Sequence, residues 1–206
     1  MQVEIVSFAE ADVFRGFLTE EELRQSAGKA NDAVRTRFVI ARGLRRRMLD
    51  EATQIRAADL RFLEDGESKP RVLDAQGWDF NISHAGEYVA CAVARGQVGV
   101  DIEQIRPVRE MESIVERYFH PDEAAEWRAL PPGLREEAFF VLWSAREAAM
   151  KCVGLGLARG MSVTRVDPSI LRESGARALV GDADLVVRRW DAPPGYVAMI
   201  AQGAAI

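Results

Sequence analysis

Helical periodicity dominates the first third of the chain. Apolar residues recur every three or four positions from residue 34 to 48, which predicts an amphipathic helix capped by Asn31 or Asp32. Thr19 precedes a run of acids and predicts the start of a shorter helix before it. A further helix is expected over residues 53–63.

Extended segments follow and are marked by alternation. Residues 3–8 predict a first strand, and residues 78–83 alternate between apolar and polar side chains, as a half-buried strand does. Residues 88–94 are almost wholly apolar, as in a central strand, and a turn at 95–97 leads into another alternating run at 98–103. These last three runs predict a three-stranded antiparallel meander.

The second half repeats the order of helices followed by strands. Helices are expected at 110–119, from 121, and at 134–152, where the glycines of VGLGL end the longest one. Three strand-like runs follow, at 161–166, 184–190 and 196–201. Because each half contains helices and then three strands, we expect two similar α+β lobes, each with a mainly antiparallel sheet packed by helices, at 1–100 and 101–206.

Composition excludes several classes of protein. The chain has 206 residues, of which 29% are charged, and it lacks the run of about 18 apolar residues that a membrane helix needs. The N-terminus does not resemble a signal peptide. A net charge of −5 argues against generic nucleic-acid binding. The arginines of residues 35–47 fit a solvated helix face, but they also allow a small polyanion or an acidic protein partner. Cys91 and Cys152 are expected to be buried thiols of a cytoplasmic protein.

The strand VGVDIEQ carries two carboxylates on one face. Asp101 and Glu103 are separated by roughly 6–7 Å along a strand. Like charges at that distance repel by about 2–3 kcal/mol at an effective dielectric near 20. A solvated edge with nearby arginines would relieve the repulsion, and so would Mg²⁺, which prefers oxygen ligands. The pair alone favours the solvated edge.

A third carboxylate lies on the helix FFVLWSAREAAMKC. Phe140, Trp143, Glu147 and Lys151 fall near one helical face, so Glu147 is expected to be drawn inward. The spacing of Glu147 and Lys151 also suits a simple helix salt bridge worth a few tenths of a kcal/mol. Only three of the 27 basic residues are lysines, which makes Lys151 a candidate for a site that needs a compact cation.

Two segments together resemble a known family. FNISHAGEYVACAVARGQVGVDIEQIRP and FFVLWSAREAAMKCVGLGL are similar to the two signature blocks of the surfactin-type 4′-phosphopantetheinyl transferases, and Lys69-Pro70 resembles the preceding block. The resemblance covers nearly the whole chain. It implies a pseudo-dimer of two α+β lobes with the active site in the cleft between them.

The resemblance also implies an activity. Such enzymes move the phosphopantetheine arm of coenzyme A onto a serine of a carrier protein and release adenosine 3′,5′-bisphosphate. Asp101, Glu103 and Glu147 inherit the role of Mg²⁺ ligands, with the acids converging from opposite lobes. Glu147 is the first candidate for the base, directly or through a water, and Glu103 is the second. Lys151 would neutralise the leaving phosphate.

The coenzyme A contacts are also carried over from the resemblance. They fall on Arg37, Lys69, Ser83, His84, Arg146 and Lys151, with Lys29 and Arg42 as candidates for the pocket rim. Arg146 stands where the family usually has Lys, which leaves its contact open. Burial in the core is the alternative for His84, although the small residues after it favour exposure. Trp143 is expected to serve structure more than chemistry.

Other functions remain open at this stage. Another Mg²⁺-dependent phosphoryl-transfer enzyme, such as a phosphodiesterase, would share the acidic residues. A non-catalytic module would grip acidic carrier domains through the arginine-rich helix. A Ser83–His84 hydrolase pair is disfavoured because Gly-x-Ser-x-Gly is absent. The expected partners are coenzyme A and an apo acyl or peptidyl carrier domain, without nucleic acid or membrane, and two lobes in one chain favour a monomer.

Overall fold

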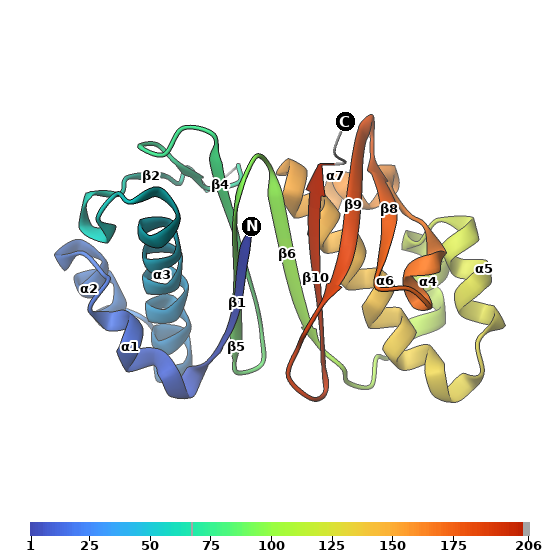
Figure 1. Cartoon of the computed structure of the whole chain (residues 1–206). Helices are drawn as coiled ribbons and strands as arrows, with labels where there is room; N and C mark the ends of the chain where they lie inside the picture. The colour runs from blue at the N-terminus through green and yellow to red at the C-terminus, as the bar shows by residue number, and fades with distance from the viewer. Residues whose placement is uncertain (67, 204–206) are drawn as a thin grey trace. The chain divides into compact units, whose positions relative to one another are not determined.

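The computed structural model describes residues 1–66 and 68–203 (Figure 1). The chain divides into two compact units, Met1–Gln97 and Val98–Ile206, here called the N-terminal and C-terminal units. Each has its own antiparallel sheet, long helix and hydrophobic core, which confirms the expected α+β class. No helix within the described residues combines the length and apolar character that crossing a bilayer requires.

In the N-terminal unit, one long helix packs on a three-stranded sheet of order β1-β5-β4 (Figure 1). Ile40, Leu44 and Met48 of the helix are fully buried against this sheet. The elements are β1 (Gln2–Ser7), α1 (Ala11–Arg15), α2 (Glu20–Ala27), α3 (Asp32–Thr53), β2 (Phe62–Leu63), β3 (Arg71–Val72), β4 (Trp78–Ala85) and β5 (Tyr88–Arg95).

The predicted caps start α2 and α3. Thr19 Oγ1 accepts a hydrogen bond from the amide of Glu22, and Asn31 Oδ1 accepts one from the amide of Val34 at 2.9 Å. The separate helix predicted over 53–63 is wrong. The α3 helix itself continues to Thr53, and Gln54 ends it in the left-handed conformation, with φ of 62°.

The C-terminal unit packs α6 along a five-stranded sheet of order β6-β10-β9-β8-β7 (Figure 1). Leu142, Ala145 and Ala149 of α6 are completely buried in its core. The elements are β6 (Val98–Gln104), α4 (Met111–Tyr118), α5 (Pro121–Ala129), α6 (Pro132–Val153), α7 (Leu157–Gly160), β7 (Thr164–Val166), β8 (Gly175–Val180), β9 (Ala183–Trp190) and β10 (Tyr196–Gly203).

The predicted meander is wrong at its third strand. β6 pairs with β10, with Asp101 opposite Met199, and does not join β4 and β5. The C-terminal sheet also contains β8, which the sequence pattern did not predict. Its inward positions include Ala176 and Ala178, and alanine has a low preference for strands.

The backbones of β6 and α6 touch at Gly99. A Cβ atom on Gly99 would lie 2.0 Å from the carbonyl oxygen of Ala148 and 2.5 Å from the amide nitrogen of Cys152. Real Cβ atoms do not approach backbone so closely, so only glycine allows this packing. Because alternate residues of a strand share a face, Asp101 and Glu103 lie on the face that α6 covers.

In each unit, a buried glutamate–arginine ion pair of the same kind holds the long helix. Glu22, in the capping box of α2, accepts from Arg46 of α3 at 2.7 Å. Glu123, in the capping box of α5, accepts from Arg146 of α6 at 2.7 Å. Each arginine also donates to backbone carbonyls, Arg46 to those of Ala57 and Leu60, and Arg146 to that of Met161. The two units are therefore similar in this buried ion pair as well as in the order of their elements.

Candidate active site

Three of the predicted catalytic side chains meet between β6 and α6. Lys151 Nζ donates to Asp101 Oδ1 at 2.6 Å and lies 3.8 Å from Glu147 Oε2. Asp101 is 2% exposed and Glu147 8%, whereas Glu103 is half-buried further along the strand. Since β6 belongs to the C-terminal sheet, all four residues lie in one unit. The expectation that the acids come from opposite lobes is therefore wrong.

Burial and mutual repulsion perturb the two glutamates. Burial, with the charges of Asp101 and Glu147, raises the pKa of Glu103 from its ordinary 4.5 to about 7. Burial also raises the pKa of Glu147, although the positive charge of Lys151 opposes the rise. A carboxyl group with a pKa of about 7, as at Glu103, is suited to holding and releasing a proton near neutral pH.

The acids fit a hard divalent cation by their chemistry. All three offer carboxylate oxygens, the ligands that Mg²⁺ prefers, and a cationic group already lies against two of them. Within residues 1–66 and 68–203, however, no three acidic, histidine or cysteine side chains are spaced as a metal coordination shell. The side chains would have to close in on such an ion. Magnesium binding therefore belongs with the proposals below.

The raised pKa of Glu103 predicts a pH-dependent stability. The folded chain holds a proton on Glu103 between pH 4.5 and about 7 that the unfolded chain has lost, so stability falls as the pH rises through this window. In EDTA, we expect the urea midpoint of the wild type to decrease between about pH 5.5 and 8 more than that of Glu103→Gln. Parallel curves for the two proteins would show that Glu103 titrates normally.

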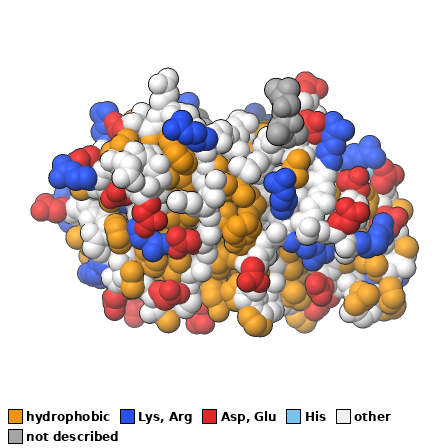
Figure 2. Space-filling model, viewed as in Figure 1, with side chains coloured by type: hydrophobic (Ala, Val, Ile, Leu, Met, Phe, Trp, Pro, Cys, Tyr) orange, Lys and Arg blue, Asp and Glu red, His pale blue; other side chains and the backbone are white. Residues whose placement is uncertain are grey.

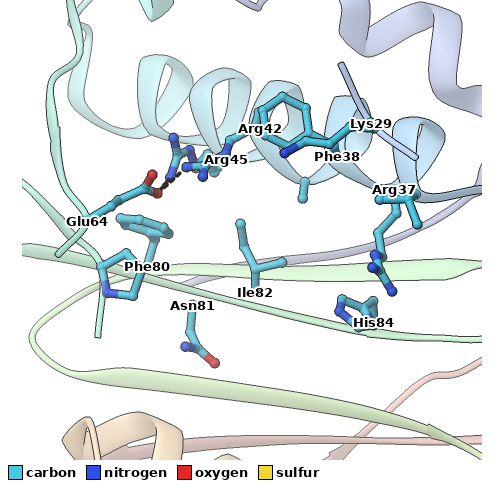
Figure 3. Close-up of a pocket in the computed structure, with 13 residues that line it drawn as sticks. Lys29, Arg37, Phe38, Arg42, Arg45, Glu64, Phe80, Asn81, Ile82 and His84 are labelled. Atoms are coloured by element: carbon cyan, nitrogen blue, oxygen red, sulfur yellow. Dashed lines mark hydrogen bonds and ion pairs between the residues drawn. The ribbon is translucent and has the colours of Figure 1, made fainter. Parts of the chain in front are cut away.

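A second group of predicted residues lines a pocket of about 360 Å³ in the N-terminal unit (Figure 3). Arg37, from α3, and His84, from β4, lie near each other at one end, so His84 is not a core residue. Lys29 Nζ lies 4.4 Å from the centre of the Phe38 ring, and Ile82 contributes to the wall from β4. Cations around an apolar surface suit an anionic ligand with a planar group.

Glu64 closes the other end of this pocket. Both Arg42 and Arg45 donate hydrogen bonds to its Oε1 atom (Figure 3). Burial would raise the pKa of Glu64, but the hydrogen bond from Arg42 and the charge of Arg45 outweigh it and lower the pKa. Arg42 and Arg45 are therefore already hydrogen-bonded to a carboxylate, whereas Arg37 lies beside His84 at the opposite end of the pocket.

Two further predicted residues do not line this pocket. Lys69 precedes Pro70, which is at the pocket wall, and its ammonium forms an ion pair with Asp79. Ser83 is buried and alternates with His84 along β4, so its side chain leaves the opposite face of the strand. Of the contacts implied by the resemblance, the pocket brings together Arg37 and His84, with Lys29 and Arg42.

The structure gives Arg146 a different role from the phosphate contact that the resemblance implied. Arg146 is 0% exposed, and its Nη1 atom donates to both carboxylate oxygens of Glu123, at 2.9 and 2.7 Å. Its Nη2 atom donates to the carbonyl of Met161. A fully buried guanidinium has no surface for a phosphate from solvent, so Arg146 holds α6 in place and is omitted from the proposed contacts.

Some residues at these sites were not predicted as functional. Phe38 was placed on the buried face of its helix, yet it also lines the pocket, where Lys29 contacts its ring. Glu64 lies in a loop, and no spacing in the sequence connects it to Arg42. Trp143 stacks on Phe139, with ring centres 5.8 Å apart, and packs against the core as expected.

Charge is otherwise mixed over the surface. Figure 2 shows acidic and basic side chains interspersed on the visible face of each unit. Many belong to exposed ion pairs, such as Arg172 with Glu126 and Arg177 with Asp184. Such pairs contribute little to stability and mark no site by themselves. Both cysteines are free and buried, as predicted.

Comparison with known proteins supports the resemblance along most of the chain. Residues 97–199 match the sequence model of the 4′-phosphopantetheinyl transferase superfamily. Residues 17–96 match that of the 4′-phosphopantetheinyl transferase N-terminal region. The two matched regions correspond closely to the two units, and the acids and Lys151 lie in the first of these matches.

Individual relatives carry the same description. The chain is 33% identical over 165 residues to 4′-phosphopantetheinyl transferase psf-1 of Bacillus pumilus, covering 80% of this chain and 69% of the relative. It is 31% identical over 154 residues to HetI of Nostoc sp., covering 71% and 65%. It is 29% identical over 152 residues to Sfp of Bacillus subtilis, covering 74% and 67%. With matches to both family regions and to these transferases, the chain belongs to the 4′-phosphopantetheinyl transferase superfamily.

Proposed function

We propose that this transferase moves the 4′-phosphopantetheine arm of coenzyme A onto a serine hydroxyl of an apo carrier protein. The observation that supports it most strongly is the grouping of Asp101, Glu147 and Lys151, at 2.6 and 3.8 Å, within the region that matches the superfamily. Carboxylates and an ammonium in this arrangement suit a phosphoryl transfer, in which catalysis rests on positioning and electrostatics.

The reaction assigns a role to each side chain. The serine oxygen bonds to the β-phosphorus of coenzyme A, and the bond from that phosphorus to the bridging oxygen breaks, releasing adenosine 3′,5′-bisphosphate. The serine proton passes to Glu147, and Glu103 is the second candidate base. Both have raised pKa values, which suits a group that must gain and lose a proton. Lys151 neutralises the charge on the leaving phosphate.

We further propose that Asp101, Glu103 and Glu147 hold Mg²⁺ during the reaction. The all-oxygen donor set supports this assignment, and so does the proximity of the three acids: burial and then the charges of Asp101 and Glu147 raise the pKa of Glu103. When bound, the ion supplies positive charge to the pyrophosphate oxygens as they develop negative charge.

The pocket of the N-terminal unit is proposed to hold the nucleotide end of coenzyme A. Arg37 supplies positive charge for a phosphate with His84 beside it, and Phe38 with Ile82 supplies apolar surface for a planar base. Lys29 and Arg42 border the pocket. Lys69 and Ser83 stay in the proposal on the strength of the resemblance alone.

The carrier class stays open. Fatty-acid, polyketide and nonribosomal-peptide carriers all present a serine beside acidic residues. That the protein acts in the cytoplasm as a monomer, without nucleic acid or membrane, remains a prediction.

A mass measurement tests the proposed activity. The protein is incubated with coenzyme A, Mg²⁺ and a panel of apo carriers, and the intact mass of each carrier is recorded. We expect at least one carrier to gain the mass of the phosphopantetheine arm, and EDTA to abolish the gain. A carrier in which the serine is replaced by alanine is the matched control and should gain nothing.

The same measurement separates the rival functions. A phosphodiesterase would cleave coenzyme A without any change in the carrier mass. A binding module would retain the carriers on a column without modifying them. An unchanged mass across the whole panel would contradict the proposal.

A further inference from the structure

We infer that Lys151 competes with a divalent ion for Asp101, and that the ion binds only after Lys151 has left Asp101. The inference rests on the proposed function and deepens it, because it concerns how the proposed ion gains access to the carboxylates. It starts from the 2.6 Å contact between Lys151 Nζ and Asp101 Oδ1.

The buried carboxylate of Asp101 needs a positively charged partner. The side chain of Asp101 is 3% exposed, and a carboxylate so deeply buried is costly without a charged partner. In the structure Lys151 supplies that charge, and it also lies 3.8 Å from Glu147. The lysine thus contacts two of the three carboxylates proposed to hold the ion.

The lysine and a divalent ion compete for the same oxygen. An Mg²⁺ ion would bind a carboxylate oxygen at about 2.0–2.1 Å, while the ammonium is already in hydrogen-bond contact with Asp101 Oδ1. Two cations that close together repel strongly in a buried site.

Lys151 is suited to leaving. Its side chain is 29% exposed, in contrast to Asp101, and its four-carbon stem carries a charge that is free to swing toward solvent. Once released, the ammonium is available to a phosphate of the substrate. A single exchange of partners would therefore load the metal and free the cation that neutralises the leaving group.

Substitutions at Lys151 test the inference through metal affinity. Binding of Mn²⁺, as a paramagnetic probe, is measured by electron paramagnetic resonance on the full chain without coenzyme A. Lys151→Met removes the competing charge, so we expect Mn²⁺ to bind about tenfold more tightly than to the wild type. Lys151→Arg keeps the charge and offers a fork that fits carboxylates, so it should bind Mn²⁺ more weakly.

Arg159→Met is the matched control. Arg159 is exposed on α7 and takes part in no ion pair among the described residues, and this variant changes the net charge by the same amount. We expect its Mn²⁺ affinity to equal that of the wild type. Circular dichroism shows whether each variant is folded. If Lys151→Met does not fold without metal, the weaker binding expected of Lys151→Arg still decides the question.

The outcomes separate this inference from the proposed function. Tighter binding in Lys151→Met, or weaker binding in Lys151→Arg, supports the exchange. Equal Mn²⁺ affinities, or no detectable binding in any variant, would overturn it, even when the wild type modifies carriers. A wild type that modifies no carrier contradicts the proposed function independently, because that assay does not depend on Lys151 leaving Asp101.

Discussion

Glu147→Gln is expected to lower the turnover number by about 10³-fold or more and to leave the fold intact. Glutamine keeps the shape of the side chain but removes the negative charge and the ability to accept the serine proton. Lys151 keeps its 2.6 Å hydrogen bond to Asp101, so the packing of α6 on β6 has no reason to change. The initial rate of carrier modification, followed by mass spectrometry, measures the effect.

Glu137→Gln is the matched control for this prediction. Glu137 lies on the same helix but is exposed, so its substitution should leave both rate and stability near those of the wild type. Thermal unfolding of both variants tests that the fold is retained. A Glu147→Gln protein that turns over at the wild-type rate would show that Glu147 neither accepts the proton nor holds the metal.

Arg146→Met is expected to lower the free energy of unfolding by about 3–5 kcal/mol, because it leaves a buried charge without its partner. Glu123 is 0% exposed and would keep only the backbone amides of His120 and Val166 as hydrogen-bond donors. Urea unfolding measures the change. Replacing Glu123 with leucine as well removes the stranded charge, and should recover part of the loss.

Two further variants serve as controls for the effect of Arg146→Met on stability and activity. Arg172→Met breaks an exposed ion pair with Glu126 and should cost about 1 kcal/mol or less. Arg146→Lys keeps the positive charge against Glu123 and should retain most of the transferase activity if the role is structural. A stable Arg146→Met protein with selectively lost affinity for coenzyme A would instead support the phosphate contact that the resemblance implied.

Local signals in the sequence predicted much of the secondary structure. Thr19 and Asn31 fixed the starts of α2 and α3 because their hydrogen bonds reach only two or three residues ahead. The alternation at 98–103 also predicted β6 correctly as a strand. Its partner was not predictable in the same way, because Asp101 pairs with Met199, which is remote in the sequence. Alternation reports that a strand exists but not which strand lies beside it.

The site shows the same division. Burial of Glu147 followed from the apolar residues on its helix face, and its spacing to Lys151 gave the ion pair. The phosphate contact implied for Arg146 differs from the structure, because a motif gives a position in the chain but not the direction of the side chain. Its partner Glu123 comes from another helix, so only the tertiary structure connects them.

The contact of two backbones at Gly99 has a consequence for engineering this protein. Side-chain packing adjusts when core residues change size, but the separation of β6 and α6 here is fixed by main-chain atoms against each other. A designer could therefore recompose the apolar interior of the C-terminal unit to gain thermal tolerance and leave Gly99 untouched. The acids on β6 and α6 would then keep their spacing, because the contact at Gly99 that sets the distance between the two elements involves main-chain atoms alone.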